Sequence, residues 1–315
     1  MALHIEERSD GGLALYIDGD FQFDSADEAI YHESLTLPAL CLARGSRPEG
    51  MRVLICGGGD GLALRECVRF PGVSAVDLVD YDATVVQLAR TRFAELNDGA
   101  FEDARVTVHF RDAWEFLNEA PCSAPERSEP APAPREYDVI VCDFTVPRTQ
   151  EQARVFTREW FEMLAARLAP AGIMAINGVS PQTTPEAFWC LDRTVHAARL
   201  STLPYRVCIP SFRDHGYGAW AFILAARRPL PATVLRTLEC PVETRLADMA
   251  QLWRGARFRR TERQAARRAP VHSSSGRAAA VPVRRGTWRP RARWRRCQEP
   301  TGWWTARAMS QMRPP

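Results

Sequence analysis

Lysine is absent from this chain of 315 residues, so arginine supplies all 41 of its basic side chains. The chain also lacks any apolar run that approaches the roughly 18 residues of a membrane span. No basic-then-apolar leader stands at its beginning. These absences predict a soluble, cytoplasmic protein without a membrane span.

Metal-ligand spacing is missing as well. Nine cysteines and six histidines are scattered along the chain, and His32 is the only histidine inside a motif. Two of the cysteines, Cys56 and Cys142, fall inside expected strands, where a reduced thiol serves as a small apolar side chain. The sequence therefore predicts reduced cysteines and no metal site.

Charge is divided unevenly along the chain. Residues 254–315 contain 17 arginines and two acidic residues, which leaves 24 basic and 36 acidic residues for residues 1–253. The tail thus has a net charge of +15 and the rest a net charge of −12, and an acidic domain suits a cationic ligand. The tail has no apolar periodicity, which predicts disorder beyond about residue 254 and no nucleic-acid partner. A nucleic-acid-binding tail and a shifted reading frame beyond about residue 250 are the alternatives.

A glycine-rich turn is the most informative feature of the sequence. Residues 53–56 are apolar without alternation, as in a strand covered on both faces of a parallel sheet. Gly57, Gly59 and Asp60 follow, and residues 62–70 then have the pattern of a helix. The glycines allow a ligand to approach the backbone closely, but the acid disfavours a phosphate. An ordinary tight turn between strand and helix is the alternative.

Acidic side chains also stand where the following strands end. Residues 75–82 form an expected strand whose Asp80 is placed to accept both ribose hydroxyls of a nucleoside. Asp82 has a second possible role as the cap of a helix over residues 83–93.

Two more expected strands, residues 106–110 and 137–142, complete the set. The first leads to Asp112 and Ala113, the usual place for a carboxylate that reads an adenine amino group, and the second delivers Asp143. Parallel strands end at one edge of a sheet, so we expect these acids to surround a nucleoside without phosphates.

These motifs belong to a longer colinear set, which comprises residues 18–22, 27–33, 57–61, 80, 112–113, 143 and 209–212. Over roughly residues 13–230 the chain resembles the polyamine aminopropyltransferases (spermidine synthase and relatives), and most closely the bacterial branch often fused to membrane spans. The resemblance implies an α/β fold, with a Rossmann-like methyltransferase-type sheet, helices on both faces and a short N-terminal β-hairpin lid. It also implies a homodimer that transfers an aminopropyl group from decarboxylated S-adenosylmethionine to a polyamine, with no tightly bound cofactor.

The resemblance assigns a role to each motif residue. Asp143 is expected to be the general base that takes the proton from the attacking amine. Donor binding is expected from Gln22, Gly57, Gly59, Asp60, Asp80, Asp112 and Ala113. Amine binding is expected from Tyr31, His32, Asp60 and Phe212.

Three positions depart from the family pattern, all on the acceptor side. Val146 stands where a second acid grips the acceptor amine, and Phe212 stands where a tyrosine hydroxyl helps to place it. Arg148 replaces part of a glycine-proline gate loop, and its charge should repel a polyamine. We expect donor binding to be kept and diamine binding to be weakened. A methyltransferase that uses intact S-adenosylmethionine and a non-catalytic descendant are the alternatives.

The expected domain plan has three parts. Residues 1–48 form an N-terminal β lid, with a single hairpin within residues 13–23, and a linking helix. Residues 49–230 form the catalytic domain, which a proline- and alanine-rich insertion interrupts at residues 121–135. Residues 231–315 form an arginine-rich C-terminal extension.

Overall fold

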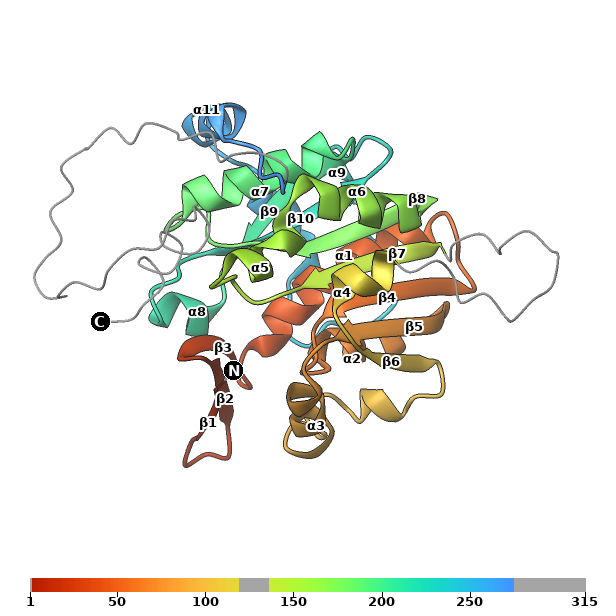
Figure 1. Cartoon of the computed structure of the whole chain (residues 1–315), viewed down its shortest axis with the longest axis vertical. Helices are drawn as coiled ribbons and strands as arrows, with labels where there is room; N and C mark the ends of the chain where they lie inside the picture. Colours follow the sequence, from red (N-terminus) through yellow and green to blue (C-terminus); the bar gives the residue numbers. More distant parts are fainter. Residues whose placement is uncertain (1, 119–135, 275–315) are drawn as a thin grey trace, which may run out of the picture.

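The computed structural model describes residues 2–118 and 136–274. This part of the chain contains a three-stranded sheet near the N-terminus and a seven-stranded sheet that forms the body (Figure 1). The proline- and alanine-rich insertion and residues 275–315 lie outside the described residues. The strands are β1 (Leu3–Glu7), β2 (Leu13–Ile17), β3 (Asp20–Asp24), β4 (Met51–Gly57), β5 (Val73–Asp80), β6 (Val106–Phe110), β7 (Tyr137–Asp143), β8 (Leu168–Asn177), β9 (Ser201–Val207) and β10 (Trp220–Ala226).

The small N-terminal sheet is antiparallel, with the order β1–β2–β3. The expected hairpin is present, and its turn uses Asp18 and Gly19, whose φ angles are 51° and 84°. The expectation of a single hairpin is incomplete, because β1 adds a third strand along β2, with Leu3 opposite Ile17. None of the five side chains of β1 is fully buried. A strand with so little buried surface leaves only a weak apolar pattern in the sequence.

The large sheet has the order β6–β5–β4–β7–β8–β10–β9, and only β10 runs antiparallel to its neighbours. This is the Rossmann-like α/β fold that the sequence predicts. The strand order reverses between β4 and β7, and ligands of open α/β sheets bind outside the carboxyl ends of the strands at such a reversal. The register places Gly57 beside Asp143 and Asp80 beside Phe110 at that edge.

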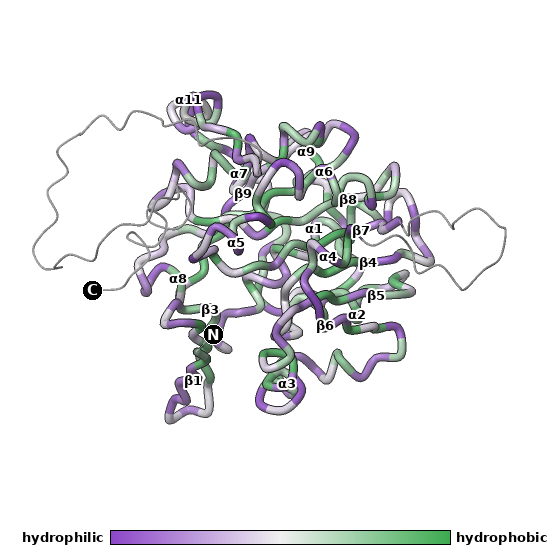
Figure 2. Tube along the Cα trace, viewed as in Figure 1, coloured by the Kyte–Doolittle hydropathy of each residue, from purple (hydrophilic) through white to green (hydrophobic). Residues whose placement is uncertain are grey.

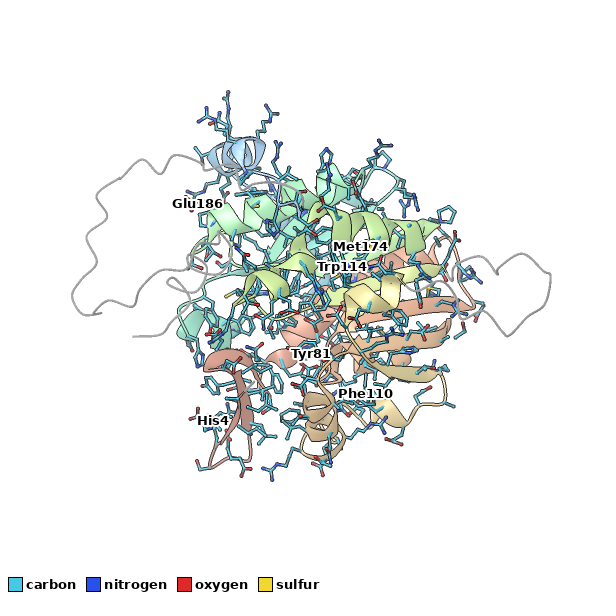
Figure 3. The ribbon with its side chains drawn as sticks, in the orientation of Figure 1. His4, Tyr81, Phe110, Trp114, Met174 and Glu186 are labelled. Atoms are coloured by element: carbon cyan, nitrogen blue, oxygen red, sulfur yellow. The ribbon has the colours of Figure 1, made fainter. Side chains whose placement is uncertain are left out.

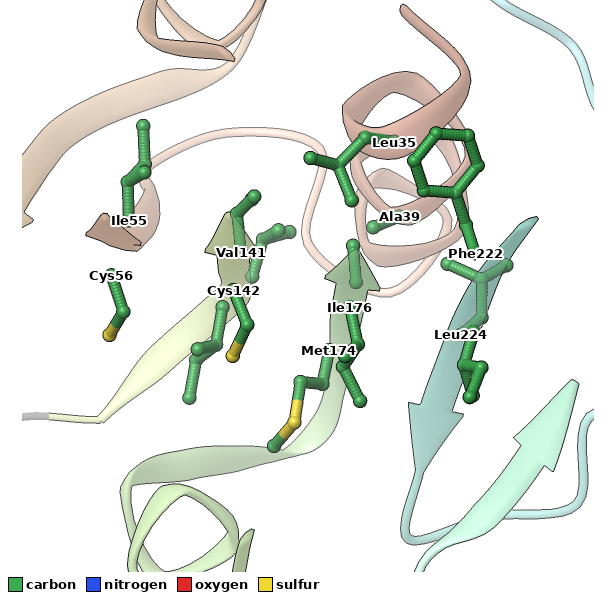
Figure 4. Packing of buried hydrophobic residues seen from close by; sticks show 14 of the residues in the cluster. Leu35, Ala39, Ile55, Cys56, Val141, Cys142, Met174, Ile176, Phe222 and Leu224 are labelled. Carbon is green, nitrogen blue, oxygen red and sulfur yellow. The ribbon is translucent and has the colours of Figure 1, made fainter. Parts of the chain in front are cut away.

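Helices cover both faces of the large sheet, with α1 and α2 on one face and α4, α6 and α7 on the other (Figure 1). The helices are α1 (Glu28–Arg44), α2 (Leu62–Val68), α3 (Ala83–Thr91), α4 (Ala113–Asn118), α5 (Gln150–Ala153), α6 (Arg158–Arg167), α7 (Pro185–Ala197), α8 (Pro210–Asp214), α9 (Thr233–Arg236), α10 (Leu252–Gly255) and α11 (Arg260–Arg268), with 3₁₀ turns η1 (Ala100–Glu102), η2 (Arg154–Phe156) and η3 (Met249–Gln251). Hydrophobic residues concentrate in the central strands (Figure 2). In that core, Leu35 and Ala39 of α1 lie beside Phe222 of β10 (Figure 4).

The C-terminal extension is packed against the body as far as residue 274. Phe258 is only 8% exposed, and its ring lies 5.9 Å from that of Phe188 and 5.0 Å from that of Trp189. The His272 N–H donates to the Thr194 hydroxyl at 2.9 Å. The prediction of disorder beyond about residue 254 is therefore wrong for residues 255–274, because one aromatic anchor and a few polar contacts hold a segment that has no apolar periodicity.

Within residues 2–118 and 136–274, no helix combines the length and the apolar character that crossing a membrane requires.

Candidate active site

The carboxyl ends of β4, β5 and β7 and the turn after β6 surround a cavity of about 480 Å³. The N-terminal sheet and α1 close it from the other side through Gln22, Tyr31 and His32. Tyr81, labelled in Figure 3, also lines the cavity and is 63% exposed. All of the expected site residues except Phe212 line this cavity: Gln22, Tyr31, His32, Gly57, Gly59, Asp60, Asp80, Asp112, Ala113 and Asp143.

The glycine turn is shaped by the strand next to it. Gly57 and Gly58 have φ angles of 79° and 68°, which residues with a side chain rarely adopt. A Cβ added at Gly57 would lie 2.3 Å from the carbonyl oxygen of Asp143, and the Gly58 N–H donates to that same oxygen at 3.0 Å. The turn therefore allows β4 and β7 to end side by side, and it holds the backbone from which the Asp143 side chain projects.

Asp80 is held by two backbone N–H groups. Gly59 donates to one of its carboxylate oxygens at 3.1 Å, and Asp82 donates to the other at 2.9 Å. A Cβ at Gly59 would lie only 2.6 Å from this carboxylate. Burial raises the pKa of Asp80 to about 6, against these two hydrogen bonds. Asp82 takes the alternative role considered from the sequence, since it caps α3 by accepting from the Thr84 N–H at 2.8 Å.

Asp143 meets α1 across the cavity. The Tyr31 hydroxyl donates to a carboxylate oxygen of Asp143 at 2.7 Å. Burial and the charge of Asp60 raise the pKa of Asp143 to about 6, while the charge of His32 and the hydrogen bond from Tyr31 oppose the rise. The result is a carboxylate that is ionised at neutral pH and close to the range in which a general base is effective.

His32 is a buried cation beside the two acids. Its Nδ1 lies 2.8 Å from a carboxylate oxygen of Glu28, one helical turn earlier. Burial disfavours the charged imidazole, but the hydrogen bond and the charge of Glu28 outweigh it and raise the pKa of His32 to about 9. Glu28 is held in turn by a two-point ion pair with Arg65, at 2.7 and 3.1 Å.

Glu28 and Arg65 are the first two members of an ion-pair chain that the sequence did not predict. Alternating charges follow one another through α1 and α2, in the order Glu28, Arg65, Glu66, Arg69 and Glu33. At its far end, Glu33 accepts the backbone N–H groups of Arg245, Leu246 and Ala247. The spacings of Glu28 with His32 and of Glu66 with Arg69 were usable local signals. The pairs Glu28–Arg65 and Glu33–Arg69 have no such signal, because each joins residues that are distant in the sequence.

The end of the cavity near β6 contains a second missed residue, Arg154. Asp112 accepts the backbone N–H groups of Trp114 at 2.9 Å and Glu115 at 3.1 Å, so it caps α4. Its other oxygen pairs with the Arg154 guanidinium at 2.5 Å. That guanidinium also lies 5.9 Å from the ring centre of Trp114, which Figure 3 labels. No local pattern marks Arg154, since its partners come from another segment of the chain.

The three residues that depart from the family pattern lie outside the cavity lining. Val146 packs against the hydrophobic core, and Phe212 of α8 is buried with its ring 5.8 Å from that of Tyr31. Arg148 donates to a carboxylate oxygen of Asp20 at 2.6 Å and to the carbonyl oxygen of Asp18 at 2.7 Å. The expected repulsion between Arg148 and a polyamine is thus offset by an ion pair with the N-terminal sheet.

The expected acceptor side nevertheless has an acidic side chain of its own. Glu151 of α5 lines the cavity, and so does Gln152, which forms a capping box with Thr149 at the start of that helix. The cavity is lined by six acidic side chains, Asp60, Asp80, Asp82, Asp112, Asp143 and Glu151, and by the two cations His32 and Arg154. Within the described residues, no cluster of histidine, cysteine and acidic side chains could hold a metal ion.

Known proteins match this arrangement over most of the chain. The family model of the spermine/spermidine synthase domain matches residues 28–230. A protein of Ralstonia nicotianae named polyamine aminopropyltransferase 2 is 39% identical over 216 residues, which are 68% of this chain and 38% of that protein. A polyamine aminopropyltransferase of Mycobacterium tuberculosis is 38% identical over 213 residues, or 68% of this chain and 37% of that protein. The chain therefore spans less than half the length of these relatives.

Solved structures agree with the fold. Spermidine synthase from Thermotoga maritima superimposes with a TM-score of 0.68 over 84% of this chain and 83% of that one, at 22% sequence identity. At this identity the likeness concerns the fold alone. The family model, which matches more than half of the chain, carries the assignment further, and the chain belongs to the spermine/spermidine synthase family.

Proposed function

We propose that this protein is a polyamine aminopropyltransferase, which transfers the aminopropyl group of decarboxylated S-adenosylmethionine to an amine such as putrescine and releases methylthioadenosine. The observation that carries the proposal is Asp143, held at the cavity by Tyr31 and by the glycine turn, with Asp60 beside it. Family membership and the names of the relatives support the same activity.

The donor is proposed to lie along the strand ends. Asp80 accepts the ribose hydroxyls, and Asp112 with the backbone of Ala113 reads the adenine. Gln22 and the glycine turn, including Gly57 and Gly59, enclose the rest of the donor. Six acids against two cations favour a positively charged ligand. An intact donor would bring its own carboxylate toward Asp60 and Asp143, so the lining favours the decarboxylated form.

The amine is proposed to enter from the side of Asp60 and Glu151, with Tyr31 and His32 helping to place it. It arrives protonated, and the charge of Asp143 attracts it before the carboxylate takes one proton. The free nitrogen lone pair then attacks the propyl carbon next to the sulfonium. The carbon–sulfur bond breaks, its electron pair stays on sulfur, and the sulfonium becomes a neutral thioether. Holding the two reactants in line supplies much of the acceleration.

Phe212 has an indirect role in this proposal, because it packs against Tyr31 and not into the cavity. A homodimer and a cytoplasmic location are parts of the same proposal and rest on the family resemblance.

Calorimetric titration tests the proposal. We expect the protein to bind methylthioadenosine and the decarboxylated donor, and to prefer the latter to intact S-adenosylmethionine. Mixing donor with putrescine, spermidine or longer amines should then release methylthioadenosine. Preference for the intact donor would indicate a methyltransferase. Absence of binding to all three nucleosides would indicate a non-catalytic descendant.

A further inference from the structure

Arg154 is one of the two cationic side chains of the cavity lining, and the proposed reaction leaves it without a role. It begins η2, between α5 and α6, and it forms an ion pair with Asp112 in the turn after β6. The other cation, His32, pairs with Glu28, which does not line the cavity, whereas both Arg154 and Asp112 do. The end of the cavity that is proposed for the adenine therefore presents a neutral ion pair to a ligand.

The Arg154 guanidinium is held in place by its neighbours. The Arg154 carbonyl oxygen accepts the Thr157 hydroxyl at 2.7 Å, which anchors the turn. The guanidinium lies 5.9 Å from the ring centre of Trp114, and that ring is stacked on the fully buried Trp160, with 6.1 Å between the ring centres. The side chain of Arg154 is nevertheless 32% exposed, so it can contact a ligand without giving up these contacts.

The two oxygens of Asp112 are used differently. Oδ1 accepts the backbone N–H groups of Trp114 and Glu115, and Oδ2 lies 2.5 Å from Nη2 of Arg154. A carboxylate oxygen has two lone pairs, so Oδ2 can accept a further hydrogen bond from a ligand. The ion pair involves only Nη2 of Arg154, and a guanidinium has further N–H donors on Nε and Nη1. The pair thus offers one acceptor and one donor side by side.

Adenine has the complementary pattern on one edge. Its N6 amino group is a donor, and the neighbouring N7 is an acceptor. The amide of asparagine or glutamine reads this edge with one acceptor and one donor. Asp112 and Arg154 supply the same two groups from two side chains.

We propose that Arg154 is a specificity-determining residue, which donates a hydrogen bond to N7 of the adenine while Asp112 accepts one from the N6 amino group. The inference rests on the proposed function, because it concerns the nucleoside part of the donor. N1, on the other side of the amino group, remains accessible to the backbone of Ala113. A purine with a carbonyl group at position 6 would place an acceptor against the Asp112 carboxylate, so the site should reject it.

Calorimetric titration of the full chain with two nucleosides tests the assignment. One is methylthioadenosine, and the other is its 7-deaza analogue, in which a C–H group replaces N7 and the amino group, the ribose and the thioether are unchanged. We expect the analogue to bind roughly tenfold more weakly, because it leaves a charged donor without its acceptor. Equal affinity for the two nucleosides would overturn the inference and leave the proposed reaction in place. Failure to bind either nucleoside would overturn both.

Two variants identify the donor. Arg154→Met keeps much of the length of the side chain and removes its N–H groups. This variant should bind methylthioadenosine roughly tenfold more weakly than the unmodified protein and should bind both nucleosides equally. If Arg154 only oriented Asp112, the variant would lose affinity for both nucleosides and keep the tenfold ratio, and that result would overturn the inference.

Arg148→Met is the matched control, because Arg148 stands six residues earlier and pairs with Asp20 outside the cavity lining. It should keep the ratio of the unmodified protein. Circular dichroism establishes that each variant is folded. Loss of the ratio in Arg148→Met as well would show that the effect does not belong to Arg154 and would also overturn the inference.

Discussion

The two ends of the active-site cavity differ in what holds their charged groups. At the proposed donor end, Asp80 and Asp112 stand where strands of the central sheet end, and backbone N–H groups fix both carboxylates. At the proposed acceptor end, Glu151 stands on a four-residue helix and is exposed. A site for one constant ligand can be built into the sheet, whereas a site for variable amines is better placed on a short loop and helix. We therefore propose that this protein keeps the family's donor and differs in its acceptor.

The largest expected effect comes from the residue between the two ends. Asp143→Asn keeps the shape of the side chain but removes the proton acceptor, so turnover should fall by about 10²–10⁴. Methylthioadenosine release measures the rate, and calorimetry should show nearly unchanged affinity for methylthioadenosine. Asp138→Asn is the matched control, because Asp138 lies at the other end of β7 and accepts the Arg52 N–H. Full activity of Asp143→Asn would remove the mechanism.

Asp80→Ala tests the donor end. The variant leaves the ribose hydroxyls without a charged acceptor, which corresponds to about 1.5–3 kcal/mol, or roughly 10- to 150-fold in affinity for methylthioadenosine. Asp82→Ala makes a comparison, since loss of the α3 cap should lower stability by about 1 kcal/mol and affect affinity less. Equal affinity of Asp80→Ala and the unmodified protein would contradict the ribose assignment.

The pH profile probes the contact between α1 and β7. Asp143 can take a proton only as a carboxylate, so kcat/KM should fall as the pH drops through about 6. In Tyr31→Phe the hydrogen bond that favours the carboxylate is gone, and this acidic limb should move to higher pH. Tyr205→Phe is the control, because the Tyr205 hydroxyl donates to the carbonyl oxygen of Ser34 instead. An acidic limb at the same pH in both variants would show that Asp143 does not set the profile.

The smallest effect is expected at the acceptor end. Glu151→Gln removes one exposed charge from the cavity wall, and the KM for a diamine should rise by about two- to fivefold, as for other exposed charges. Val146→Asp should change this KM less, because Val146 packs against the core and does not line the cavity. A larger gain in diamine use from Val146→Asp than the loss from Glu151→Gln would reverse this assignment of the acceptor side.

The sequence predicts which residues meet at the strand ends, because these residues obey local rules. The apolar run before Gly57 and the acids after each strand all follow from strand periodicity, and parallel pairing brings them together. Local rules do not predict the ion pairs Arg154–Asp112 and Glu28–Arg65, because the two partners of each pair are far apart in the sequence. The burial of Phe258 is not predicted either, since a single buried aromatic residue produces no hydrophobic periodicity in the sequence. Arg148 is the opposite case. Its charge can be read from the sequence, but its ion pair with Asp20 cannot.

The buried ion-pair chain has a consequence for how the molecule opens. Removing one partner of a buried pair typically costs about 3–5 kcal/mol, because an uncompensated charge stays behind. Fraying of α1 or of the segment from Arg245 to Ala247 would likewise leave the charge of Glu28 or Glu33 without its partners. These stretches should therefore open only together with the central sheet. Their backbone amides would then exchange hydrogen as slowly as those of β4, although the segment after Cys240 contains neither helix nor strand until η3 begins.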